Sequence, residues 1–248
     1  MSSLIINPEV GHEEGPAEAL WYISPYFSQI RDIVAARGKD YTYLYKEQCT
    51  KDQVWNALQQ KRTAVIAATG HGNASVYTGY QLEPIFWVDM INEGYNPQLT
   101  QNTIMLMLSC LTAQRLGPYM TSKGAIYYLG WSVEYVIAVY PGVRKEEDSI
   151  DQLFLKPIEV GFSRVAVGDM TPIECKNYIA KKYTEYAPLL PPHERAALLS
   201  DRDNMVLLPA QPSILVSQVG CGSLGLALGL GLMHILNPPI QAPKRGEK

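Results

Sequence analysis

Three short stretches of unbroken apolar sequence constrain the fold of this chain most strongly. They are residues 63–68 (TAVIAA), 103–108 (TIMLML) and 125–129 (AIYYL), and each ends within two residues of a glycine or serine. Apolar runs of this length, with no polar residue at every second position, are typical of strands covered on both faces, as in parallel sheets.

Segments with helical patterns separate these runs. Ser24-Pro25 predicts a helix start, with serine as the N-cap and proline at the first helical position, and the helix would end near Gly38. Further helices are expected at residues 111–121, 149–168 and 172–186, and additional strands at 3–6, 41–45 and 205–208. The predicted fold class is α/β, with a mostly parallel sheet sandwiched by helices and a hydrophobic C-terminal tail.

Size and charge limit the number of domains and the class of partner. The chain has 248 residues, 47% of them hydrophobic, which suits one core, and we expect a single α/β domain at residues 1–210. The net charge is −3 and the basic residues are scattered. Nucleic acid is therefore not expected as a partner, because phosphate binding needs a basic face.

The C-terminal segment, residues 211–248, differs from the rest in composition. Residues 204–243 contain no Asp, Glu, Lys or Arg, and residues 214–236 are long enough to cross a bilayer as a helix. Glycines at 225, 229 and 231 fit close helix packing in lipid. Two interpretations stay open: a membrane anchor, or an apolar element that packs on the domain or binds a partner.

The cysteines and the N-terminus indicate the compartment. Cys49, Cys110, Cys175 and Cys221 are far apart, without a CxxC pair or a histidine at metal-ligand spacing, so we expect no metal site. The N-terminal residues lack the basic and apolar regions of a signal peptide. We expect free thiols and a cytoplasmic location, with anchoring through the C-terminus as the open extension.

Two reactive side chains follow two of the predicted buried strands. His71 comes after residues 63–68 and Cys110 comes after residues 103–108. In open α/β sheets, sites form at the carboxyl ends of the strands, so neighbouring strands would bring thiol and imidazole to one crevice. A histidine can take the proton of a cysteine and make it a nucleophile.

The glycines on either side of His71 have a role in this hypothesis. Gly70 and Gly72 let the backbone turn sharply and approach a substrate closely. The backbone amides of Gly72 and Cys110 could then hold the oxyanion of a tetrahedral intermediate.

These motifs resemble a known family. An apolar strand ending in Thr-Gly-His-Gly, followed about forty residues later by a strand ending in Leu-Ser-Cys, resembles the caspase–gingipain–legumain group of cysteine peptidases (clan CD). The stretch LSCLTA, followed by residues 125–129 and Gly-Trp, is most similar to the gingipain and CHAT-domain branches. The resemblance implies a caspase–haemoglobinase-like fold, with His71 as base, Cys110 as nucleophile, and Gly72 and Cys110 as oxyanion donors.

The same resemblance implies a substrate-binding loop after residues 125–129. Trp131 would wall the specificity pocket and Ser132 would contact the substrate. Glu134 is the only charged residue in this loop, and a partly buried carboxylate there would favour a basic side chain before the cleaved bond. The alternative is that Glu134 is simply solvated.

The sequence therefore predicts a cysteine endopeptidase that acts on a peptide or protein substrate through an acyl-enzyme, without a metal or organic cofactor. The alternative is a catalytically inactive scaffold of the same fold that serves as an interaction or membrane-associated module. Oligomer formation stays open in both. The match of residues 220–225 to GxGxxG is rejected as a dinucleotide site, because a second strand with an acidic ribose ligand does not follow it.

Overall fold

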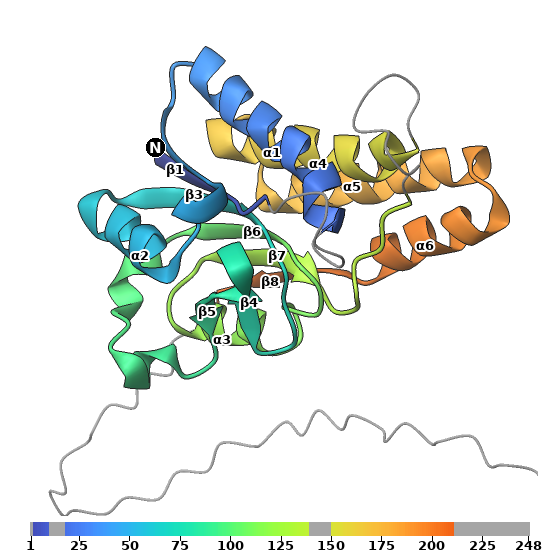
Figure 1. The fold of residues 1–248 in the computed structure, drawn as a ribbon. Helices are drawn as coiled ribbons and strands as arrows, with labels where there is room; N and C mark the ends of the chain where they lie inside the picture. Colours follow the sequence, from blue (N-terminus) through green and yellow to red (C-terminus); the bar gives the residue numbers. More distant parts are fainter. Residues whose placement is uncertain (1, 10–17, 139–149, 211–248) are drawn as a thin grey trace, which may run out of the picture. The chain divides into compact units, whose positions relative to one another are not determined.

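The apolar runs form the centre of a six-stranded sheet (Figure 1). The computed structural model describes residues 2–9, 18–138 and 150–210. The strand order is β2-β1-β3-β6-β7-β8, in which the first five strands are parallel and β8 is antiparallel to β7. The strands are β1 (Ser2–Asn7), β2 (Asp40–Tyr45), β3 (Thr63–Thr69), β6 (Ile104–Leu108), β7 (Tyr127–Trp131) and β8 (Met205–Pro209).

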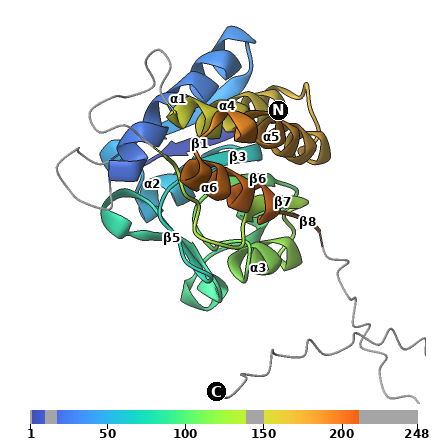
Figure 2. The same cartoon turned by 90° about the vertical axis from the view of Figure 1, so that its right-hand side faces the viewer.

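Helices cover both faces of this sheet (Figure 1; Figure 2). On one face lie α1 (Glu18–Ala36), α4 (Asp151–Val167) and α5 (Pro172–Tyr186), and α6 (Pro192–Asp203) packs against α5. On the other face lie α2 (Lys51–Gln60), α3 (Leu116–Ser122) and a hairpin of β4 (Val76–Thr78) and β5 (Pro84–Trp87). Short 3-10 turns occur at Lys46–Gln48, Tyr80–Leu82, Met90–Glu93, Pro97–Thr100 and Ala187–Leu189.

The central strands are buried on both faces, which explains their unbroken apolar sequence. In β3, Val65 and Ala67 pack under α1 and α4, whereas Ile66 and Ala68 pack on the side of α2 and the hairpin. Because successive side chains of a strand point to opposite faces, each face demands an apolar residue at every second position. The predicted fold class, an α/β domain whose mostly parallel sheet is sandwiched by helices, is confirmed.

The start of α1 differs from the prediction. The helix begins at Glu18, so Ser24 is not an N-cap and Pro25 lies inside the helix. Leu20, Tyr22 and Ile23 are buried, and this burial offsets the hydrogen bond that an internal proline removes. Tertiary packing therefore overrides the local start signal.

The helix expected at residues 111–121 also begins later, at Leu116. Leu111 adopts a left-handed conformation, with φ of 61°, which a helix cannot include. Residues 111–115 form a turn that directly follows the candidate nucleophile Cys110, as described below.

The predictions for residues 211–248 lie outside the described residues, so the domain boundary near residue 210 stays a prediction. Among the helices that the structure describes, none has both the length and the apolar character needed to cross a membrane.

Truncation of a central strand should cost far more stability than truncation of a surface residue of the same type. Leu106 of β6 is fully buried, whereas Leu189 is 70% exposed. We expect Leu106→Ala to lower the free energy of unfolding by about 2–5 kcal/mol, because it leaves a cavity. Leu189→Ala should change it by under about 0.5 kcal/mol. Urea denaturation measures both, and equal losses would contradict this packing.

Candidate active site

His71 and Cys110 follow the carboxyl ends of two neighbouring strands. β3 and β6 pair in parallel, with Thr69 opposite Leu108, so each reactive residue stands two positions beyond a paired residue. The Gly70 amide donates to the Leu108 carbonyl at 3.3 Å and extends the ladder into the loops. The predicted adjacency of the two strands is confirmed, and both residues lie at the same edge of the sheet.

Gly72 brings the loop of His71 into contact with the turn of Cys110. A Cβ atom at Gly72 would lie 2.3 Å from Ser109 Oγ, 2.6 Å from Thr112 Cγ2 and 3.0 Å from the Cys110 carbonyl oxygen. No side chain larger than hydrogen fits there without displacing the turn. The glycine therefore allows the two loops to pack directly on each other.

The β4–β5 hairpin holds the backbone of His71. The His71 carbonyl accepts hydrogen bonds from the amide of Thr78 at 3.0 Å and from its hydroxyl at 3.3 Å. The Asn73 amide donates to Val76 at 2.9 Å, and these bonds form a bridge that joins Gly72 and Tyr77. Since the two amides of this bridge belong to Asn73 and Thr78, the Gly72 amide is not used in it.

The sequence analysis did not identify this hairpin, although β-branched and aromatic residues at 76–78, followed by Gly79, are a strand-and-turn signal.

The turn of Cys110 is tied to the loop that follows β7. The Leu111 amide donates to the Val133 carbonyl at 2.9 Å, and the Gln114 side chain donates to the Ser132 carbonyl at 2.7 Å. The left-handed conformation of Leu111 is strained for a residue other than glycine, and these bonds hold it. The backbone therefore changes direction immediately after Cys110.

The residues after β7 form a loop, residues 132–136, that passes beside the thiol. The Cys110 sulfur lies 4.0 Å from the Tyr135 carbonyl oxygen, at the outer limit for a thiol hydrogen bond. At its start the loop is joined to the residue that follows α6, because the Ser132 amide donates to the Asn204 carbonyl at 3.0 Å.

The structure places the three predicted substrate-binding residues in different surroundings. Trp131 is fully buried in the core. Its indole N–H donates to the Asp201 carbonyl at 2.9 Å, which joins the end of β7 to α6. Ser132 is half-buried, and its hydroxyl lies 3.3 Å from the Asn204 carbonyl oxygen. Glu134 is exposed. Substrate contact by these residues stays a prediction.

Asp201 is a residue of this region that the sequence analysis did not identify. Its carboxylate accepts a hydrogen bond from the Val136 amide at 3.2 Å, and it is fully buried. The signal in the sequence is its position three residues after Leu198, which places both residues on the inward face of α6.

Burial makes both reactive groups neutral at neutral pH. It lowers the pKa of His71, which leaves the imidazole free to accept a proton. Burial raises the pKa of the Cys110 thiol, backbone hydrogen bonding at Tyr135 and at Cys110 itself opposes this in part, and the charges of Glu134 and Asp201 raise it further. Both side chains are therefore held in their uncharged forms at neutral pH.

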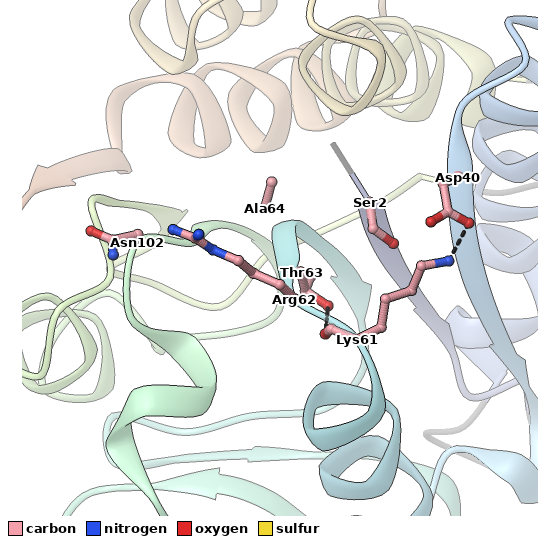
Figure 3. A pocket seen from close by; sticks show the side chains of 7 residues that line it. All are labelled: Ser2, Asp40, Lys61, Arg62, Thr63, Ala64 and Asn102. Atoms are coloured by element: carbon pink, nitrogen blue, oxygen red, sulfur yellow. Dashed lines mark hydrogen bonds and ion pairs between the residues drawn. The ribbon is translucent and has the colours of Figure 1, made fainter.

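A hollow of about 530 Å³ lies at the amino-terminal ends of the strands (Figure 3). Its lining includes Ser2, Asp40 and Thr63, the first residues of β1, β2 and β3, and an ion pair of Lys61 with Asp40. This hollow therefore lies at the end of the strands opposite to His71 and Cys110. Within the described ranges, no group of three or more metal-binding side chains occurs.

Comparison with known proteins yields a structural likeness only. No protein-family model and no curated protein matches the sequence. Among solved structures, the chain is similar to the complex of the Porphyromonas gingivalis RgpB pro- and mature domains, with 10% sequence identity and a TM-score of 0.49. The likeness covers 84% of this chain and 47% of that chain, so this chain spans about half the length of the chain it matches.

The contact of Gly72 with the Cys110 turn can be tested by one added methyl group. We expect Gly72→Ala to lower the free energy of unfolding by about 1–3 kcal/mol, because the new Cβ must displace Ser109 and Thr112. The control Ser75→Ala changes the same loop without adding an atom and should be near neutral. Thermal unfolding measures both, and wild-type stability of Gly72→Ala would contradict the contact.

Proposed function

We propose that this chain is a cysteine endopeptidase in which His71 is the base and Cys110 is the nucleophile. The observation that carries the proposal is the placement of both residues beyond the carboxyl ends of paired strands, with Gly72 packed against the Cys110 turn. The sequence motifs that resemble clan CD peptidases support the same assignment.

In the proposed mechanism the first half-reaction forms an acyl-enzyme. His71 takes the proton of the Cys110 thiol, and the sulfur attacks the carbonyl carbon of the scissile peptide bond. The amides of Gly72 and Cys110 donate hydrogen bonds to the resulting oxyanion. When the intermediate collapses, the C–N bond breaks, the imidazolium gives its proton to the leaving amine, and a thioester remains.

The second half-reaction hydrolyses the thioester. His71 takes a proton from a water molecule, whose oxygen attacks the acyl carbon. The C–S bond then breaks, the sulfur regains its proton, and the carboxylic acid product leaves. Every step uses a peptide substrate, water and the residues of this chain, so neither a metal nor an organic cofactor is required.

A non-catalytic scaffold is the second candidate. The observation that favours it is the environment of Cys110, where burial and two nearby carboxylates disfavour the thiolate. Such a module would use the α/β domain, together with residues 214–236, to join a membrane or a complex.

Site-resolved alkylation separates the two candidates. A dyad makes Cys110 react with iodoacetamide faster than Cys49 and Cys175, which are fully buried. Exposure alone favours Cys110 as well, so the decisive comparison is His71→Ala, which should slow alkylation of Cys110 about tenfold at neutral pH. Hydrolysis of a peptide substrate should fall by roughly 100-fold or more in the same variant.

Peptide mass spectrometry after alkylation assigns the label to each cysteine, including Cys221. The control His193→Ala changes a histidine of α6 that lies outside the site, and it should leave the rate unchanged. If His71→Ala reacts like the wild-type protein and peptides are not cleaved, the scaffold is the better description.

The proposal includes cleavage after Arg or Lys, because Glu134 is the only charged residue in the loop beside Cys110, although its side chain is exposed and not partly buried. A positional peptide library measures this preference. We expect Glu134→Gln to reduce cleavage after basic residues about two- to fivefold, as for an exposed ion pair of up to about 1 kcal/mol. The control Glu185→Gln, on α5, should have no effect. A preference for Asp, or an unchanged basic preference in Glu134→Gln, would remove Glu134 from the pocket.

A further inference from the structure

Asp201 is a buried carboxyl group that neither half-reaction uses. It lies near the end of α6 with no exposed surface, three residues after the buried Leu198. One oxygen, Oδ1, accepts a hydrogen bond from the Val136 amide at 3.2 Å. The other, Oδ2, is buried and has no hydrogen-bond partner among the described residues. A half-satisfied buried carboxyl group is costly, so its presence calls for a role.

The end of α6 holds the 132–136 loop at both ends. At the start of the loop, the Trp131 indole donates to the Asp201 carbonyl at 2.9 Å, and the Ser132 amide donates to the Asn204 carbonyl at 3.0 Å. At the far end, the Asp201 carboxyl group receives the Val136 amide. Asp201 therefore contacts Trp131, directly before the loop, through its main chain, and Val136, at the end of the loop, through its side chain.

Between these two anchors the loop faces the candidate nucleophile. The Tyr135 carbonyl oxygen lies 4.0 Å from the Cys110 sulfur, and the Val133 carbonyl accepts the Leu111 amide at 2.9 Å. A continuous path of contacts thus runs from α6 through residues 132–136 to the Cys110 turn.

We propose that Asp201 is a positioning residue that acts on Cys110 through the 132–136 loop. The inference deepens the proposed function and rests on Cys110 being its reactive thiol. The carboxyl group keeps the Tyr135 carbonyl beside the sulfur, which limits access to the thiol.

The same carboxyl group also acts on the thiol through its charge, which depends on pH. Burial raises the pKa of Asp201 to about 8, opposed in part by the Val136 amide. The titratable groups that face it are Cys110, Tyr135 from the loop and Tyr183 from α5. Below pH 8 Asp201 is neutral and adds no charge. Above pH 8 it becomes negative and opposes ionisation of the Cys110 thiol.

The test is the rate of Cys110 alkylation by iodoacetamide between pH 6 and pH 10, measured on the full chain by peptide mass spectrometry. Asp201→Asn keeps an acceptor for the Val136 amide but cannot ionise. We expect its rate to equal that of the wild-type protein at pH 6–7 and to exceed it by about threefold or more at pH 9. A purely structural role would change thermal stability without this divergence.

Two further variants complete the design. Asp201→Ala removes the acceptor, releases the loop and should accelerate alkylation severalfold across the whole pH range. Asp203→Asn removes a carboxylate from the exposed side of the same helix, where it pairs with Arg202, and should follow the wild-type profile.

Superimposed profiles of Asp201→Asn and the wild-type protein from pH 6 to pH 10 would overturn the inference, and so would equal shifts in Asp201→Asn and Asp203→Asn. If Asp201→Ala does not fold, Asp201→Asn decides alone. Because alkylation reports on the thiol itself, the result stays readable if His71→Ala has no effect, so failure of the peptidase proposal and failure of this inference are distinguishable.

Discussion

The parallel pairing of β3 with β6 is the interaction on which the candidate site depends. Both strands are buried on both faces, so a slip of register by one residue would move each side chain into the packing of the opposite face. Since the pair is parallel, both strands end at the same edge, and the bond from Gly70 to Leu108 continues their alignment into the loops. The positions of His71 and Cys110 are consequences of this ladder.

Around this ladder, each reactive residue has its own backbone support. The β4–β5 hairpin receives the carbonyl of His71, and the loop after β7 receives the turn of Cys110. Main-chain hydrogen bonds hold both loops, and the side chains of Thr78 and Gln114 add one hydrogen bond to each. The thiol and the imidazole are partly withdrawn from water by the same packing, which keeps both neutral and shapes the chemistry that they can perform.

Local signals in the sequence predicted some elements and misplaced others. The helix predicted at residues 172–186 is confirmed as α5, whose first turn is capped by Thr171 within one helical turn. Ser24-Pro25 carries an equally good local signal, yet α1 begins at Glu18, seven residues before Pro25, because Leu20, Tyr22 and Ile23 gain more by burial in the core. The difference lies in the energy of contacts with distant residues, which a local pattern does not contain.

By itself, the sequence determined the central strands, the α/β class and the order of His71 and Cys110, because unbroken apolar runs can be accommodated only where both faces of a strand are covered. Only the tertiary structure decided which strands are neighbours and how closely Gly72 meets the Cys110 turn. It also decided that Asp201, more than ninety residues beyond Cys110, fixes the loop beside the thiol. Such contacts join residues that are far apart in the chain. Their energies depend on how deeply the groups are buried and how close they lie, and both are set only by the folded structure.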